Sequence, residues 1–228
     1  SGTTNTLNGV AYGNSTFVTV GFSGTILTSP DGTTWTGRTS GTSNNLWKVN
    51  YVNSTFVTIG DSGTILTSTD GTTWTTRDSG IGGVHLYGVS YENSIFVAVG
   101  KIGTVLTSTD GTSWTSRTSG TTERLNGVTY GNNAFVVVGY SGTILTSTDG
   151  ATWTAQISGT TNILYGVTYG NSTFIAVGTS GTILTSSDGT SWTSRTSGTS
   201  NRLLGVNYVN TTISPESAFM AGGHYGTN

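Results

Sequence analysis

The chain of 228 residues has only 8% charged residues, a formal net charge of −2 and a pI of about 5.5. It has no run of Lys and Arg, which argues against a nucleic-acid surface, and no apolar run of the roughly 18 residues that a membrane-spanning helix needs. Cysteine is absent, so disulfides, thiolate metal sites and cysteine nucleophiles are excluded. An uncharged surface rich in Ser and Thr, without cysteine, leads us to expect an extracellular or cell-surface protein.

A unit of about 39 residues recurs along the chain. One Trp of each unit is separated from the next by 39, 40, 39 and 39 residues, and the Leu that opens each unit steps by the same amounts. Five units are complete and a sixth is partial, and we place them at residues 7–45, 46–85, 86–124, 125–163, 164–202 and 203–228. The sequence therefore predicts a repeat protein.

Turn signals fall about ten residues apart within each unit. In the first unit Gly13-Asn14, the segment 21–24 and Asp31-Gly32 separate runs rich in Val, Ile, Phe, Tyr, Trp and Thr. Asn and Gly supply the positive φ that tight hairpin turns need. We expect four strands in each unit, named A to D, which in the first unit are Gly9–Tyr12, Phe17–Val20, Thr25–Ser29 and Thr34–Thr39.

Four strands joined by consecutive hairpins form an antiparallel meander, and here both faces of the sheet carry apolar residues. Such a sheet must be covered on both sides, and blades stacked radially in a ring cover one another. We therefore predict an all-β fold, a β-propeller of four-stranded antiparallel blades in a single domain over residues 1–228. Six blades with an incomplete last blade, or five blades with an extra hairpin, both fit the repeat count.

Each complete unit carries one turn motif between strands C and D, which reads Ser29-Pro-Asp-Gly-Thr-Thr-Trp35 in the first unit. It resembles the Asp-box of bacterial neuraminidase-type (BNR) repeats and of photosystem II assembly-factor-like propellers, with one residue fewer between Asp and Trp. The resemblance implies a structural role, in which the Asp bonds backbone N–H groups and the Trp caps the hydrophobic layer. These residues are Asp31, Asp70, Asp110, Asp149 and Asp188 with Trp35, Trp74, Trp114, Trp153 and Trp192.

The same resemblance brings a sialidase-like glycosidase into consideration. It implies an arginine cluster, a Tyr–Glu nucleophile pair and an acid Asp from non-equivalent blade positions. Five of the ten carboxylates belong to the turn motif and four of the six arginines recur at one repeat position, so no catalytic pair is indicated. His85 and His224 are expected to be solvated loop residues without further metal ligands. We therefore expect no enzyme, no cofactor and no metal site, and keep the glycosidase as a distant alternative.

Differences between units concentrate at the residue after the strand A Leu, in the B–C turn and in the D–A loop. In an antiparallel meander the B–C and D–A connections emerge at the same edge, so the three sets share one face. Exposed aromatic residues beside polar ones suit sugars or protein surfaces. The candidate binding residues are Trp47, Tyr87, Tyr165, Phe22, Asp61, Lys101, Tyr140 and His224.

Two functions follow from these patterns. We expect a non-enzymatic extracellular binding or adhesion module that engages a glycan or a protein surface through the variable face, without nucleic acid or membrane insertion. The alternative is a structural or assembly subunit, such as a filament, appendage or scaffold component, joined through the partial unit at residues 203–228. An exposed strand edge there would be a template for pairing with a neighbour.

Overall fold

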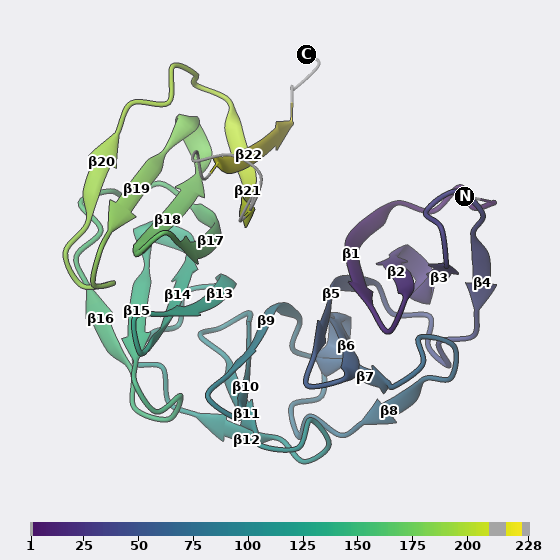
Figure 1. Cartoon of the computed structure of the whole chain (residues 1–228). Helices are drawn as coiled ribbons and strands as arrows, with labels where there is room; N and C mark the ends of the chain where they lie inside the picture. The colour runs from purple at the N-terminus through teal and green to yellow at the C-terminus, as the bar shows by residue number, and fades with distance from the viewer. Residues whose placement is uncertain (1, 210–217, 225–228) are drawn as a thin grey trace. The chain divides into compact units, whose positions relative to one another are not determined.

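The computed structural model of the chain describes residues 2–209 and 218–224, with side chains described as far as Tyr208. Within these residues the strands form five four-stranded antiparallel sheets and one two-stranded sheet, which confirms the predicted meander (Figure 1). No helix in this part of the chain is long and apolar enough to span a membrane. The chain divides into two compact units after residue 116, and each is described by itself. The single domain expected over residues 1–228 stays a prediction.

The first unit holds three four-stranded blades. Strand A is longer than the turn signals indicated, because its ends still pair with strand B, and strand D is only three residues long. The strands are β1 (Leu7–Gly13), β2 (Thr16–Gly21), β3 (Ile26–Ser29) and β4 (Thr36–Arg38); β5 (Leu46–Val52), β6 (Thr55–Gly60), β7 (Ile65–Ser68) and β8 (Thr75–Arg77); and β9 (Leu86–Glu92), β10 (Ile95–Gly100), β11 (Val105–Ser108) and β12 (Thr115–Arg117), which reaches the unit boundary.

The second unit holds two four-stranded blades and the two-stranded sheet. This sheet corresponds to strands A and B of the partial sixth repeat. The strands are β13 (Leu125–Gly131), β14 (Ala134–Gly139), β15 (Ile144–Ser147) and β16 (Thr154–Gln156); β17 (Leu164–Gly170), β18 (Thr173–Gly178), β19 (Ile183–Ser186) and β20 (Thr193–Arg195); and β21 (Arg202–Val209) with β22 (Ala218–His224).

The A–B hairpins close with two residues in the left-handed region. In the first blade these are Asn14 and Ser15, with φ of 45° and 55°. Such a turn matches the right-handed twist of the flanking strands, and Asn tolerates this conformation better than most residues do. The position of Asn in the sequence motif is therefore explained by the backbone of the turn.

Within each compact unit, apolar residues are buried between neighbouring blades. Val18 and Val20 of β2 pack with Leu46, Val49 and Phe56 of the second blade, and all five are at most 1% exposed. Burial of each such side chain contributes roughly 1.5–3 kcal/mol to folding. The fourth and fifth blades pack in the same way within the second unit, where Val136 and Val138 join Leu164 and Phe174. The core is thus a series of layers between blades.

Within each compact unit, strand A of one blade packs closely on strand A of the next. The Tyr51 ring lies so near Gly13 that a Cβ on this glycine would overlap it. In the second unit Tyr169 lies on Gly131 in the same way, and Tyr208 of β21 lies on Gly170. The two-stranded sheet therefore docks on the fifth blade as a further blade would, through the contact that the complete blades use.

The Ser-x-Asp-Gly motif forms the same hydrogen-bonded turn in all five blades, and we call it the Ser–Asp turn. In the second blade Oδ1 of Asp70 accepts bonds from the Ser68 hydroxyl at 2.9 Å and from the backbone N–H groups of Thr72 and Thr73 at 2.8 Å. The Trp74 Nε1 donates to the carbonyl of Gly71 at 3.0 Å. Hydrogen bonds from the Thr72 hydroxyl and from these backbone groups lower the pKa of Asp70 well below its ordinary value.

Candidate binding surface

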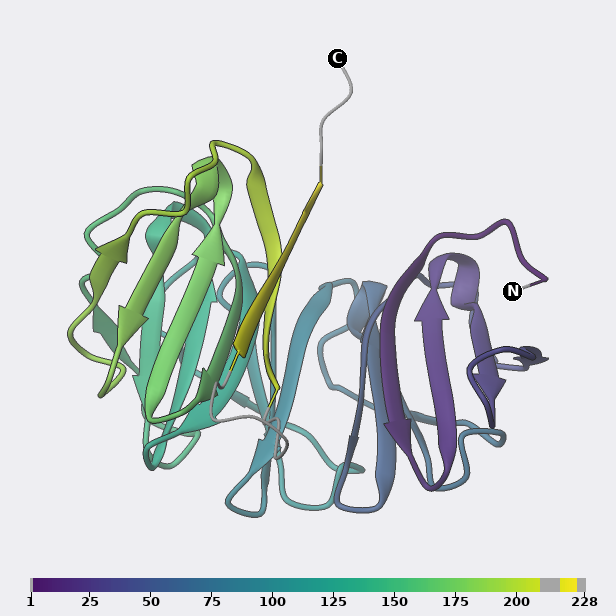
Figure 2. The ribbon, with the colours of Figure 1, turned by 45° about the horizontal axis from the view of Figure 1, so that its top comes forward.

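The B–C turns and D–A loops lie at one edge of each blade, opposite the Ser–Asp turns. Figure 2 shows the strands of each blade running between these two edges. In the first compact unit, the backbone N–H of the first residue of each B–C turn donates to a carbonyl of the preceding loop. The Asp61 N–H donates to the Asn45 carbonyl at 2.9 Å, and the Lys101 N–H donates to the His85 carbonyl at 2.9 Å. We call this edge the loop edge. It gathers the three variable sets, as the sequence predicted.

A line of aromatic side chains crosses the loop edge of the first unit. The ring centroids of Phe22 and Trp47 lie 5.5 Å apart in a T-shaped contact, and those of Trp47 and Tyr87 lie 6.0 Å apart. The three residues come from three successive blades, so each inter-blade step adds one ring. Phe22 is 36% exposed, and Trp47 and Tyr87 are half-buried. We call these three side chains the aromatic row.

Asp61 holds the centre of the aromatic row in place. Its Oδ1 accepts a hydrogen bond from Nε1 of Trp47 at 2.6 Å, and its Oδ2 accepts one from Nδ2 of Asn45 at 2.9 Å. Nδ1 of His85 lies 2.7 Å from the same Oδ1. The Ser62 backbone N–H also lies 3.4 Å from this Nδ1, and the His85 and Asp61 side chains form an ion pair when the imidazole is protonated.

His85 is therefore not the solvated loop residue that we expected from the sequence. Its side chain is 33% exposed, and its ring lies 6.3 Å from that of Tyr87. The contacts of Asn45 and His85 with Asp61 were also missed, because they join residues 16 and 24 positions apart across blades. The sequence offered one weak signal for these contacts. Among the B–C turns, only that of the second repeat begins with a carboxylate, Asp61.

The loop edge of the second unit is built differently. Tyr140 contacts Arg124, whose guanidinium carbon lies 5.2 Å from the ring centroid, and Tyr165 is half-buried. The side chain of Asn126 donates to the carbonyl of Leu164 at 2.8 Å. The backbone of His224 pairs with Arg202, and its side chain lies outside the described residues. Of the eight predicted binding residues, the structure brings Phe22, Trp47, Tyr87 and Asp61 into direct contact in the first unit.

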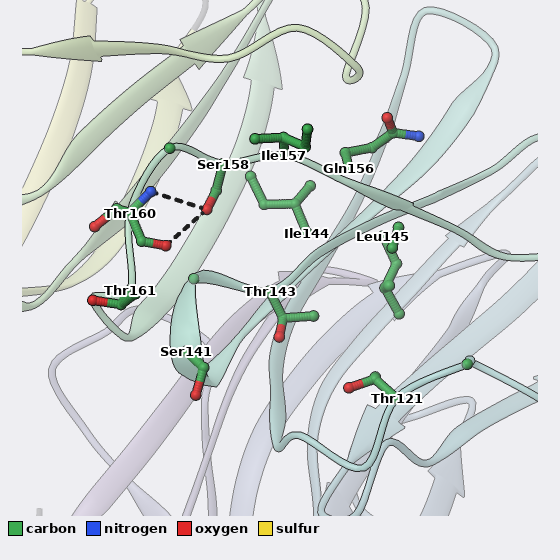
Figure 3. Close-up of a pocket in the computed structure, with 14 residues that line it drawn as sticks. Thr121, Ser141, Thr143, Ile144, Leu145, Gln156, Ile157, Ser158, Thr160 and Thr161 are labelled. Atoms are coloured by element: carbon green, nitrogen blue, oxygen red, sulfur yellow. Dashed lines mark hydrogen bonds between the residues drawn. The ribbon is translucent and has the colours of Figure 1, made fainter.

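A second candidate is a groove on the fourth blade, shown in Figure 3. It has a volume of about 810 Å³, and its walls come from β15, β16, the B–C turn and the D–A loops before and after the blade. Ile144 and Leu145 form its floor, and Ser158 and Thr160 bond each other at its rim. The equivalent grooves of the second and fifth blades are about 560 and 490 Å³.

The fourth-blade groove also differs in charge. None of its lining residues is charged, whereas Arg77 and Asp78 line the second-blade groove and Arg195 lines that of the fifth. Gln156 takes the place of the arginine and donates to Thr146 Oγ1 at 2.8 Å, as Arg77 Nε does to Thr67 Oγ1. Ile157 beside it is 88% exposed. The groove is thus a local departure from the repeat, without a polar cluster aimed into it.

No protein-family model matches the chain, and no curated protein matches it. Solved structures do: YCF48 bound to D1 peptide has a TM-score of 0.73 at 18% identity, covering 96% of this chain and 74% of that one. YCF48 from Cyanidioschyzon merolae has a TM-score of 0.70 at 15% identity, covering 90% and 77%. A streptogramin B lyase has a TM-score of 0.82 at 11% identity, covering 100% and 86%.

At these identities the likeness shows the fold, and with the repeated four-stranded sheets it confirms the predicted β-propeller. The described residues hold five complete blades and the two strands of a sixth repeat. The narrower resemblance of the Ser–Asp turn to an Asp-box stays a prediction.

Proposed function

We propose that the chain is a non-enzymatic binding module that holds a segment of another protein on its aromatic row. The observation that carries this proposal is the unbroken line of ring contacts from Phe22 through Trp47 to Tyr87. Aromatic anchors in fixed positions dominate protein interfaces, because they supply contact area with little loss of side-chain freedom. Asp61 fixes Trp47 before any partner arrives, which lowers the cost of binding.

The spacing of the row suits an extended segment. An extended chain rises about 3.3 Å per residue and points alternate side chains to the same face. Alternate residues therefore lie roughly 6.6 Å apart, close to the steps of 5.5 and 6.0 Å between the rings. Successive side chains on one face of a bound segment would meet successive rings of the row.

The comparison with known structures adds support of a general kind. YCF48, which shares the fold, has a structure bound to D1 peptide, so a protein with this architecture can hold a peptide. A streptogramin B lyase also shares it, so the fold alone does not separate binding from catalysis. The non-enzymatic role rests on the carboxylates: Asp61 and the turn aspartates are occupied as hydrogen-bond acceptors. An extracellular location stays part of the proposal.

A glycan is the second candidate ligand. The half-buried rings of Trp47 and Tyr87 could stack against sugar faces, and Asn45 and Asp61 supply the polar groups that sugars need nearby. Asp61 is already bonded to three side chains, so its acceptor capacity is largely used. We therefore place the protein segment first.

The test screens the purified chain against a displayed library of random linear peptides and, in parallel, against a glycan array. A Trp47→Ala, Tyr87→Ala variant is compared with Tyr165→Ala, which removes a loop-edge ring from the second unit. We expect peptides to be selected, and the double variant to weaken their binding by about a hundredfold, since loss of two interface aromatics costs roughly 2–4 kcal/mol. The Tyr165→Ala control should bind normally.

Two other outcomes would redirect the proposal. Glycan binding that the double variant abolishes would replace the protein segment with a carbohydrate. Silence in both screens would overturn the binding role and favour assembly through residues 203–228. That alternative has its own support, because among the described residues β22 pairs only with β21, whereas strand B of every complete blade also pairs with strand C.

A further inference from the structure

The third B–C turn departs from the others at its central residue. In four blades this residue is a Ser with φ between 52° and 55°, as in Ser23 and Ser62. In the third blade it is Ile102, with φ of 57°. The left-handed region is uncommon for any residue with a side chain and a marked outlier for a β-branched one. Ile102 therefore strains the turn in a way that Ser does not.

The fold of the turn does not require this isoleucine. The Lys101 N–H donates to the His85 carbonyl at 2.9 Å and the Thr104 N–H to the Lys101 carbonyl at 3.2 Å, which repeats the bonds of the second-blade turn. The side chain of Ile102 is 61% exposed, so it contributes little to the core.

The charge around this turn restricts the partner further. Asp61, the carboxylate that holds Trp47, already has the His85 imidazole as a neighbour, with Nδ1 of His85 2.7 Å from its Oδ1. Lys101 is exposed beside Ile102, and its backbone is bonded to His85, whose ring lies 6.3 Å from that of Tyr87 at the end of the aromatic row. A cation next to an exposed apolar side chain complements a carboxylate next to an apolar side chain.

We infer that Ile102 and Lys101 form the end of the proposed peptide site and select a segment in which an apolar residue adjoins Asp or Glu. The inference rests on the proposed function and names the partner chemistry that it leaves open. Ile102 meets the apolar side chain, Lys101 meets the carboxylate, and the aromatic row takes the residues that follow. A sugar would gain nothing from this exposed isoleucine.

The experiment uses the full chain, peptides selected from the displayed library, and three single variants: Ile102→Ser, Lys101→Glu and, as a control, Ile157→Thr. Ile157 is a second exposed isoleucine, without positive φ and on the other unit. We expect Ile102→Ser to raise the melting temperature while weakening peptide binding by about tenfold. A residue with a purely structural role would not move the two quantities in opposite directions. Ile157→Thr should leave binding unchanged.

Lys101→Glu tests the charge rule. The selected peptides should carry Asp or Glu beside an apolar residue, and Lys101→Glu should weaken them while binding the same peptides with Lys in place of the acid more tightly. The inference is wrong if Ile102→Ser and Lys101→Glu bind as the unchanged chain does while Trp47→Ala, Tyr87→Ala does not, and the proposed function then stands. If no peptide is selected, the proposed function fails and the inference fails with it.

Discussion

The two edges of each blade use the repeat in opposite ways. At the Ser–Asp turns both backbone and side chains repeat, and the hydroxyl-to-carboxylate bond measures 2.9 Å in each of the five copies. At the loop edge the backbone bonds repeat, but the side chains change from Phe22 to Asp61 to Lys101. One edge is therefore scaffold throughout, and the other is a scaffold that carries variable groups, as binding loops on a rigid framework do.

The largest effect is expected where the loop edge acts as scaffold. Gly24 has φ of 67°, and a Cβ on it would overlap the carbonyl of Thr42. Gly41 has φ of 75° with open space around it, so it serves as a matched control. We expect Gly24→Ala to lower the free energy of unfolding by about 3 kcal/mol, and Gly41→Ala by about 1 kcal/mol. Chemical denaturation measures both, and equal losses would contradict the role of the Thr42 contact.

A middle-sized effect separates the two kinds of aspartate. Asp70→Ala removes the acceptor of the backbone bonds in a Ser–Asp turn. We expect it to lower the free energy of unfolding by about 1 kcal/mol, a small value because solvent screens this exposed carboxylate, and to leave peptide binding intact. Asp61→Ala should also lower stability, because its carboxylate is only 18% exposed and contacts Asn45, Trp47 and His85, and in addition it should release Trp47 and weaken peptide binding by about tenfold. Calorimetry and tryptophan fluorescence follow the two effects. If Asp70→Ala impaired binding more than Asp61→Ala, the division between the edges would fail.

The sequence predicts the repeated parts of the molecule well. The spacing of Trp and Leu locates the blades, and the meander topology alone brings B–C turns and D–A loops to one edge. The bounds of strand D were wrong, because the Ser–Asp turn occupies residues that look like strand in their composition. The side-chain pairs of the loop edge could not be predicted. Whether His85 reaches Asp61 depends on the rotation between blades, which no spacing in the sequence records.

The grooves show the same limit. The sequence shows that Gln156 and Ile157 stand where the other complete repeats have Arg followed by Thr or Asp. It does not show what this difference does to the groove. Only the structure shows that these two residues line an uncharged groove that is larger than its equivalents on the second and fifth blades. Departures from a repeat can thus be located from sequence, while their physical meaning requires the neighbouring blade.

The smallest effect is a loss of stability in acid that comes from the Ser–Asp turns. Backbone N–H bonds from Thr152 and Ala151 lower the pKa of Asp149 from 3.8 to about 2, and similar bonds lower the pKa of the other four turn aspartates. Because the folded-state pKa lies below the unfolded one, the contribution is complete above about pH 5 and is lost as the pH falls through the folded pKa. The turn aspartates should therefore cause no change in melting temperature between about pH 5 and 7. Below about pH 4 their protonation should lower the melting temperature. Asp149→Asn should flatten part of this slope, because its amide oxygen still accepts the backbone bonds without titrating; an unchanged slope would show that the turns do not set the acid limit.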